Sequence, residues 1–132
     1  MLVPCEVAVK CLLPAVRATT SKQLMEKHNL NQAQAAKLLG LSQPAISLYA
    51  RKMRGKALDL EEDAEIAKLV SNLASSLAEG NLSHKEFIPK FCEICRTIRA
   101  KGLLCKMHKA FDPSINIEEC ELCTTMNQLR CP

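Results

Sequence analysis

The sequence predicts an all-α protein, and three observations support this fold class. First, its 132 residues are 48% hydrophobic but only 3% aromatic, which favours a helical core of Leu, Ile, Val and Ala. Second, apolar residues recur near the helical period of about 3.6 residues, and no segment alternates as a strand would. Third, helix-capping residues precede these segments and glycines follow them. The length corresponds to one small domain or two very small ones.

The N-terminal half is expected to begin with two or three helices. Pro4 suits a first helical position, and the apolar spacing after it predicts one or two helices, loosely joined near Thr19–Ser21. A short helix over Gln32–Leu39 follows, because Asn31 with a Gln three positions later forms a capping-box pattern. Gly40 supplies the left-handed residue that commonly ends a helix.

Further helices are expected along the rest of the chain. Ser42 can cap the next one, and Pro44 is tolerated in its first turn. The expected ranges are 42 to about 53, 59–80 and 83–102, the last two again beginning with capping-box patterns. Short helical fragments are expected on either side of the turn Asp112-Pro113-Ser114.

Charge divides the chain into three regions. Residues 1–57 contain nine Lys or Arg and two Glu, a net charge of +7, whereas residues 58–80 contain one Lys and six acids, a net charge of −5. Residues 81–132 have a net charge of +2, so the total of +4 conceals a strongly basic first half. A basic region of this kind is typical of a nucleic-acid surface, and a solvated lysine face is the alternative.

Membrane proteins and enzymes find little support in the sequence. No run approaches the roughly 18–20 apolar residues of a membrane span, and Glu6, Lys10 and Arg17 interrupt the apolar N-terminal segment. We therefore expect a soluble, cytoplasmic protein. The chain has no phosphate-binding loop and no nucleophile with a recognisable base, so we expect no catalysis, and a redox enzyme or electron carrier is poorly supported.

The segment of residues 30–55 has the layout needed for insertion into a DNA major groove. It predicts a short helix, a turn containing Gly, and a second helix with a polar and basic outer face. Its apolar residues would form a shared core, while the outward side chains of the second helix have no packing role. Gln can form two hydrogen bonds with adenine and an Ala methyl can contact thymine. The candidates on this helix are Gln43, Ala45, Ser47 and Arg51, and Gln32 on the first helix is a candidate phosphate donor.

The stretch QAQAAKLLGLSQPAISLYARKMRG resembles the Cro/repressor-type helix-turn-helix of the XRE family, and the likeness covers roughly residues 20–57. It implies a module that binds double-stranded DNA, with Gln32, Ser42, Gln43, Ser47 and Arg51 facing the DNA. The basic residues Lys52 and Arg54 complete the candidate set. The whole chain also resembles archaeal predicted transcriptional regulators that carry a cysteine-rich C-terminal region. The alternative is a helical hairpin that binds protein or only forms a core.

A module of this size is expected to bind DNA as a homodimer. Two copies would occupy neighbouring half-sites about 34 Å apart, because one copy buries limited DNA surface. An apolar stripe on the acidic helix could pack on a second copy, or it could pack on the tail of its own chain. The stripe consists of Ile66, Leu69, Val70, Leu73 and Leu77.

Six of the eight cysteines lie in the last 41 residues, in a pattern that predicts a metal site. Two CxxC pairs and a CxxH unit are typical of metal ligation in a reducing compartment. The candidate ligands are Cys92, Cys95, Cys105, Cys120 and Cys123. His108 is a weaker candidate, and Cys131 ranks lower because chain ends fray. Cys5 and Cys11 are expected to be small core residues, and His28 and His84 surface residues.

Three interpretations of this cysteine pattern remain open. An iron–sulfur cluster, 4Fe–4S in the first instance, suits cysteines presented from a helix into an apolar pocket. A structural zinc could take four groups such as Cys92, Cys95, Cys105 and His108. A reversible thiol–disulfide switch is the third possibility.

These observations predict a sequence-specific transcriptional regulator that senses redox state or iron–sulfur supply. The expected organisation is a DNA-binding domain at 1–57, an acidic connecting and dimerisation helix at 58–80, and a cluster-binding region at 81–132. The alternative is a protein-interaction or transcription-associated module with a purely structural zinc. Salt dependence distinguishes the two, because phosphate contacts weaken steeply as salt rises.

Overall fold

In the computed structural model, helices form all the regular structure of the described residues, which are 2–52, 55, 58–80, 82–120 and 123. The all-α prediction is therefore confirmed. The elements in order are α1 (Pro4–Val7), the π-helical segment η1 (Ala8–Leu12), α2 (Leu13–Lys27), α3 (Gln32–Leu39), α4 (Gln43–Ala50), α5 (Ala64–Ala78), α6 (His84–Ala100) and α7 (Cys105–Phe111). None of the described helices is long and apolar enough to cross a membrane.

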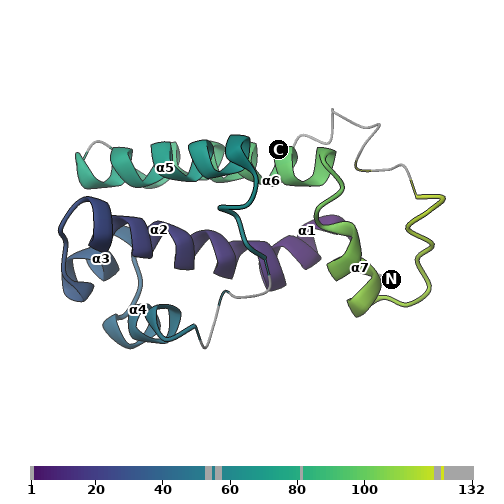
Figure 1. Cartoon of the computed structure of the whole chain (residues 1–132), viewed down its shortest axis with the longest axis horizontal. Coiled ribbons are helices and arrows are strands. Elements are labelled where there is room, and N and C mark those ends of the chain that lie inside the picture. Colours follow the sequence, from purple (N-terminus) through teal and green to yellow (C-terminus); the bar gives the residue numbers. More distant parts are fainter. Residues whose placement is uncertain (1, 53–54, 56–57, 81, 121–122, 124–132) are drawn as a thin grey trace.

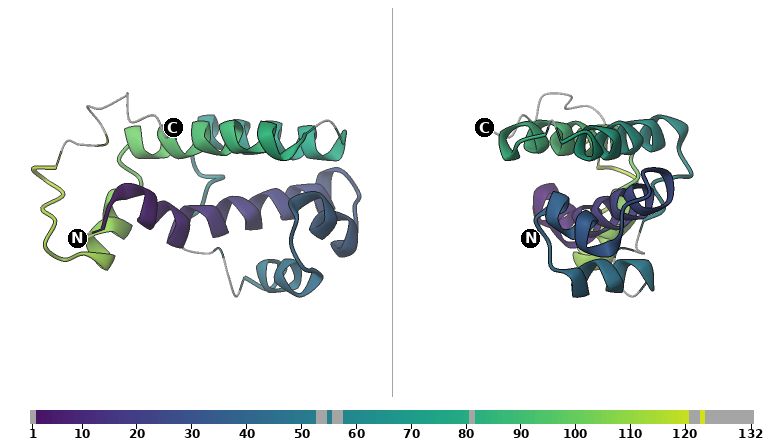
Figure 2. Two further views of the ribbon diagram at one scale, coloured as in Figure 1. Left: turned by 180° about the vertical axis from the view of Figure 1, so that it is seen from behind. Right: turned by 90° about the vertical axis from the view of Figure 1, so that its left-hand side faces the viewer.

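Figure 1 shows α2 along the middle of the molecule, with α5 and α6 on one side and α4 on the opposite side. The views in Figure 2 show the same order of layers and place α7 next to α1 at the other end of the molecule from α3 and α4. The helix-turn-helix elements and the cysteine-rich elements therefore occupy opposite ends of the long N-terminal helix.

The N-terminal helix continues through Thr19–Ser21, so the loose joint that the sequence predicts there is absent. Thr20 and Ser21 are buried, and the Ser21 hydroxyl donates to the Ala18 carbonyl at 2.9 Å. The departure from regular α-helix comes earlier, at η1. Pro14 in the first turn of α2 has no N–H to donate, and the wider π turn before it accommodates this missing bond.

The main core lies between α2, α5 and α6. The α5 residues Ile66, Val70, Leu73 and Leu77 are at most 4% exposed, and Leu69 packs against the same cluster. Burial of each such side chain contributes about 1.5–3 kcal/mol. Of the two alternatives for this stripe, the structure shows packing within its own chain, because α2 and α6 cover it.

The acidic helix begins later than the sequence predicts, at Ala64 instead of Asp59. Asp63 caps it by accepting from the backbone N–H groups of Glu65 and Ile66 at 3.0 and 3.2 Å. The preceding residues form a turn, in which Leu60 is 4% exposed in the core. A helix through this segment would move Leu60 out of the core, so packing overrides the earlier capping signal.

The last two helices follow the predicted signals closely. The backbone N–H of Ser83 donates to Glu86 at 2.7 Å in front of α6, and Gly102 beyond its end has a φ of +71°. α7 is then fixed to the N-terminus. The Leu2 N–H donates to the Asp112 carboxylate at 3.2 Å, and His108 Nε2 lies 2.7 Å from the Leu2 carbonyl.

Candidate functional site

The turn between α3 and α4 has the predicted local structure. Asn31 and Gln34 exchange side-chain to backbone hydrogen bonds of 2.8 and 2.9 Å in front of α3, which confirms the capping box. Gly40 ends α3 with a φ of +66°, and the Leu41 N–H donates back to the Ala36 carbonyl at 2.9 Å. These bonds satisfy backbone groups at both ends of α3 and hold the chain in the tight turn that leads into α4.

The inward face of α4 fixes it against α2 and α3. Ile46 is fully buried, Tyr49 is 8% exposed, and both pack with Ala36 in a second hydrophobic cluster. The Ser42 hydroxyl caps α4 by accepting from the Ala45 N–H at 3.3 Å. The helix ends at Ala50 and not near residue 53 as expected, and the chain turns away where Lys52 adopts a φ of +56°.

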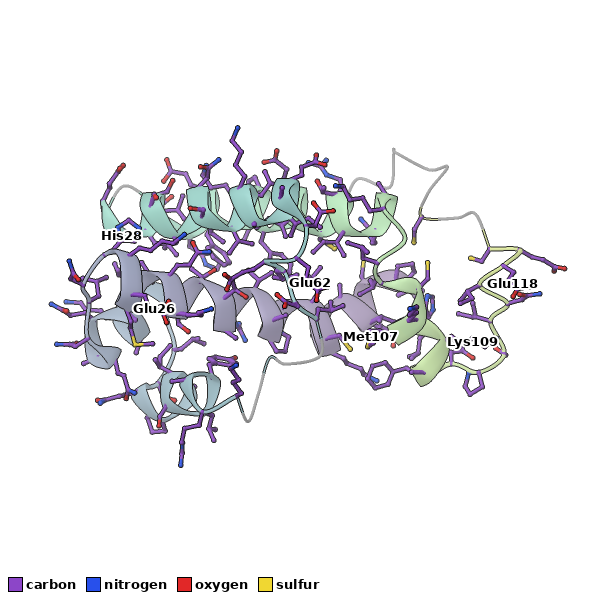
Figure 3. All side chains as sticks on the ribbon, in the orientation of Figure 1. Glu26, His28, Glu62, Met107, Lys109 and Glu118 are labelled. Carbon is purple, nitrogen blue, oxygen red and sulfur yellow. The ribbon has the colours of Figure 1, made fainter. Side chains whose placement is uncertain are left out.

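The outward face of α4 is open to solvent. Ser42, Gln43 and Arg51 are exposed, and Ser47 is half-buried one turn after Gln43. Figure 3 shows side chains of α4 extending away from α2. Of the other candidates, Gln32 is half-buried at the start of α3, Ala45 packs partly against the second cluster, and Arg54 lies outside the described residues. The structure thus places the described polar candidates on the surface of α3, the turn and α4.

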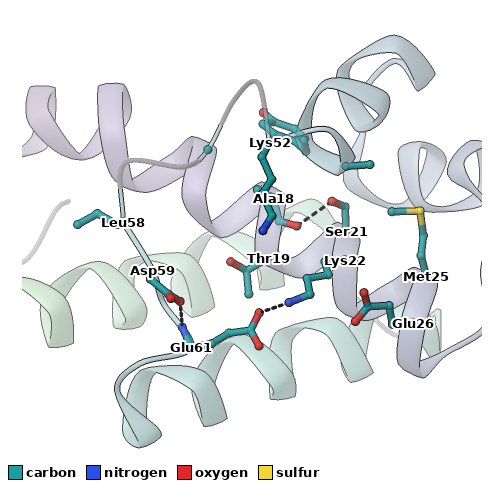
Figure 4. A pocket seen from close by; sticks show the side chains of 13 residues that line it. Ala18, Thr19, Ser21, Lys22, Met25, Glu26, Lys52, Leu58, Asp59 and Glu61 are labelled. Carbon is teal, nitrogen blue, oxygen red and sulfur yellow. Dashed lines mark hydrogen bonds and ion pairs between the residues drawn. The ribbon is translucent and has the colours of Figure 1, made fainter.

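Lys52 has surroundings unlike those of the other candidates. It lines a hollow of about 510 Å³ between α2, the end of α4 and the segment before α5 (Figure 4). Glu26, Asp59 and Glu61 line the same hollow, and Lys22 Nζ forms a 3.0 Å ion pair with Glu61 that raises the pKa of Lys22. The carboxylates oppose the approach of phosphate, so Lys52 is the least favourably placed basic candidate among the described residues.

The candidate metal ligands lie on α6, on α7 and in the C-terminal segment. As predicted, Cys92 and Cys95 belong to one continuous helix, and Cys95 is 7% exposed in the main core. Cys105 begins α7 and is half-buried, Cys120 is exposed, and Cys123 is half-buried. No three Cys, His, Asp or Glu side chains within the described part of the chain form a ready-made metal site.

Three of these cysteines share one end of the molecule with two residues that the sequence did not single out. Burial raises the pKa of the Cys123 thiol, the Arg99 guanidinium opposes this rise, and Cys105, Cys120 and Cys5 add to it. These groups are within electrostatic range of Cys123, but the described ones among the cysteines do not form a metal-holding group. Figure 3 shows sulfur atoms gathered at this end of the molecule, around the labelled Met107.

The N-terminal cysteines and His108 differ in part from the predictions. Cys11 is 4% exposed and is a core residue, as expected, and burial raises the pKa of its thiol. Cys5 is exposed, so its assignment to the core is wrong. His108 Nε2 donates to the Leu2 carbonyl, so this nitrogen is not available as a metal ligand. Cys131 lies outside the described residues.

Sequence reasoning missed Cys5 and Arg99 for a physical reason. Cys5 lies at the same end of the molecule as Cys105 because α1 packs against α7, and no local spacing indicates that contact. By sequence alone, Arg99 would be taken for an ordinary surface cation on an amphipathic helix, whereas it is buried in the structure. It could have been noticed only by its place on the apolar side of α6, one turn after Cys95.

Comparison with known protein families identifies the N-terminal elements. Residues 22–61 match a family described as Helix-turn-helix. The match begins within α2, includes α3 and α4, and ends before α5, so these residues form a helix-turn-helix domain of the XRE type. Neither a curated protein nor a solved structure matches the chain.

Proposed function

We propose that the helix-turn-helix domain binds double-stranded DNA in a sequence-specific manner and that the chain regulates transcription. The observation that carries this proposal is the division of α4 into two faces. Ile46 and Tyr49 anchor the inner face, while Gln43 and Ser47 leave the outer face polar and accessible. The helix also belongs to the region of +7 net charge, which attracts the phosphate backbone.

The polar side chains of this surface contact different parts of the DNA in the proposed complex. Gln43, in the first turn of α4, enters the major groove and forms two hydrogen bonds with an adenine. Ser47 lies one turn further along the same face. Gln32 and the N-terminus of α3 contact phosphate, and Arg51 contacts phosphate at the end of α4. Ser42 orients α4 through its cap and offers its hydroxyl proton to the backbone of the DNA.

A salt titration tests DNA binding directly. Fluorescence anisotropy with a labelled random-sequence duplex, measured from 50 to 200 mM salt, gives the slope of log K against log salt. We expect a steep negative slope, because each phosphate contact releases counterions. Absence of binding at 50 mM salt would refute the proposal and favour the protein-interaction alternative.

Two pairs of variants separate base recognition from phosphate contact, using a duplex selected from the random pool. Gln43→Ala is expected to weaken the selected site by about 1–3 kcal/mol and to relax preference at one base pair. Asn72→Ala, an exposed amide on α5, is the matched control. Arg51→Ala is expected to weaken all sequences alike and to reduce the salt slope, whereas Lys68→Ala on α5 removes the same charge from the other side of the molecule. Equal losses in Gln43→Ala on all sequences would show that Gln43 contacts no base.

The proposal includes a homodimer, since one domain occupies one half-site. The α5 stripe is buried within its own chain, so the dimer must form through another surface. Sedimentation equilibrium with and without a duplex that carries two half-sites measures the stoichiometry. Two chains per duplex support this part of the proposal, and one chain per duplex contradicts it.

The proposal also assigns an iron–sulfur cluster to the cysteine-rich end, where it would make DNA binding responsive to oxidation or iron supply. Half-buried thiols next to an apolar core favour such a cluster over a solvent-exposed site. Anaerobic purification followed by an absorption spectrum near 400 nm and iron, sulfide and zinc analysis tests it. Iron and sulfide in stoichiometric amounts support the cluster, whereas colourless protein with one zinc identifies a structural site.

A further inference from the structure

The hollow beside Lys52 has the size of a site for a small organic molecule. Its volume of about 510 Å³ lies within the range of roughly 300–1,000 Å³ that is typical of ligand pockets. Three parts of the chain line it, namely α2, the last residues of α4 and the segment before α5 (Figure 4). An occupant of this hollow would therefore contact the end of the helix that faces DNA in the proposed complex.

Direct contacts hold the walls of the hollow in place. Gly55 lies so close to α2 that a Cβ on it would be 2.6 Å from the Ala18 side chain. Lys22 Nζ forms the 3.0 Å ion pair with Glu61, which joins α2 to the segment before α5. Tyr49 is 8% exposed and anchors the end of α4 in the second hydrophobic cluster. The hollow is thus bounded by packed parts of the fold.

Part of the lining is apolar. Ala18 and Met25 on α2, and Leu58 before α5, line the hollow as half-buried side chains. Met25 and Leu58 also pack against the main core, so the core sets their positions. An occupant with an apolar body would cover these side chains, and the removal of apolar surface from water would favour its binding.

The carboxylates of the lining favour a positively charged occupant. Glu26, Asp59 and Glu61 line the hollow together with Lys22 and Lys52. The hydrogen bond with Glu61, and in addition the charges of Glu26 and Asp59, raise the pKa of Lys22. Figure 4 shows Glu26 and Asp59 on opposite sides of the ion pair between Lys22 and Glu61. Carboxylates in this arrangement attract a cation and repel an anion.

We propose that the hollow binds a small organic cation with an apolar body, an amine on an aromatic or alkyl group, and that this occupant strengthens DNA binding. The ammonium group lies among the carboxylates, and the apolar body covers Ala18, Met25 and Leu58. The occupant offsets the carboxylates that oppose the approach of phosphate near Lys52. Binding of the cation is independent of the proposed function, whereas its effect on DNA rests on that function.

Three probes of similar size and different charge test the site, namely phenethylamine, 2-phenylethanol and 3-phenylpropionate. A proton–nitrogen NMR titration of the full chain measures the affinity for each probe and shows which backbone amides respond. We expect phenethylamine to bind about fivefold more tightly than 2-phenylethanol, which is close to the most that an exposed ion pair contributes. It should shift the amides of Ala50 and Glu61, which line the hollow. Equal binding of the three probes, or tighter binding of 3-phenylpropionate, would overturn the preference for a cation.

Variants separate the charge of the lining from the shape of the hollow. Glu26→Gln keeps the size of the side chain and should reduce the advantage of phenethylamine over 2-phenylethanol about twofold. Glu62→Gln is the matched control, because Glu62 is exposed in the segment before α5 but does not line the hollow. Thr19→Leu fills part of the hollow from α2 and should weaken both probes alike. Equal effects of Glu26→Gln and Glu62→Gln would reveal a general charge effect and overturn the site.

The anisotropy assay with the labelled duplex tests the effect on DNA, with phenethylammonium chloride replacing sodium chloride at constant ionic strength. We expect the affinity for the duplex to rise about twofold in the wild type and in Glu62→Gln, and less in Glu26→Gln. Binding of phenethylamine without a change in DNA affinity would overturn its effect on DNA and leave the site standing. Absence of phenethylamine binding would overturn both parts of the inference. A chain that binds phenethylamine but no duplex would refute the proposed function and the effect on DNA, and the site would stand.

Discussion

Gly40 and Gly55 have nearly the same backbone conformation, yet replacing each with Ala should destabilise the protein to very different extents. Their φ angles are +66° and +73°, in the left-handed region that costs other residues about 1–2 kcal/mol. A Cβ on Gly40 would have no atom within 4 Å. Ala also lowers the entropy of the unfolded chain, which offsets about 0.4–1 kcal/mol. The net loss in Gly40→Ala is therefore about 1 kcal/mol.

Gly55 has no such space. A Cβ there would lie 2.6 Å from the Ala18 side chain and 2.6 Å from the Pro14 carbonyl oxygen, both on α2. Favourable contact between such atoms begins near 3.5 Å, so the chain must move away from a helix backbone that is itself fixed in the core. Overpacking of this kind costs about 1–3 kcal/mol in addition to the backbone term. We expect a total loss of about 3 kcal/mol for Gly55→Ala.

Urea unfolding followed by circular dichroism at 222 nm measures both losses in free energy of unfolding. The difference between the two variants isolates the contact with α2, because the backbone term is shared. A difference near 2 kcal/mol is expected. Equal losses, or a smaller loss in Gly55→Ala, would refute the close approach of Gly55 to α2.

Three other perturbations test the structure at separate places. Ile46→Ala should lower the free energy of unfolding by about 2–5 kcal/mol, because the Ile46 side chain is fully buried on the inner face of α4. Urea unfolding measures this loss. Asp63 accepts from Lys101 and from the first N–H groups of α5, which lowers its pKa below the usual 3.8. The stabilising contribution of ionised Asp63 is therefore complete above that pH and is lost as the pH falls below it. In a plot of melting temperature against pH, Asp63→Asn should therefore show a smaller decrease between pH 5 and pH 2 than the wild type. His108→Phe removes the hydrogen bond to the Leu2 carbonyl and should increase amide hydrogen exchange in α1. Unchanged exchange would show that this bond does not fix α1 on α7.

Local signals in the sequence determined the helix-turn-helix. Asn31, Gln34, Gly40 and Ser42 act on backbone groups within four residues, so their effect does not depend on the rest of the fold. The same is true of the Ser83 capping pattern in front of α6. For this reason α3, the turn and the start of α4 lie where the sequence predicts them, and the described polar candidates of that segment lie on the surface as the pattern requires.

The tertiary structure decided the features that depend on contacts between distant segments. Asp59 and Asp63 both offer a cap for α5, and burial of Leu60 selects the later one. The apolar pattern of α5 is compatible with packing on a second copy and with packing on its own chain. The position of α2, which covers this stripe, shows that it packs within the chain.

Cys5 provides the clearest case of this division. Its spacing from the C-terminal cysteines carries no signal, whereas the packing of α1 on α7 brings it to the same end of the molecule as Cys105. Periodicity and caps are interactions between neighbours in sequence, so the sequence alone determined the helices and the polarity of their faces. Which helix faces pack together depends on many weak contacts between distant segments, and these contacts are known only from the folded structure.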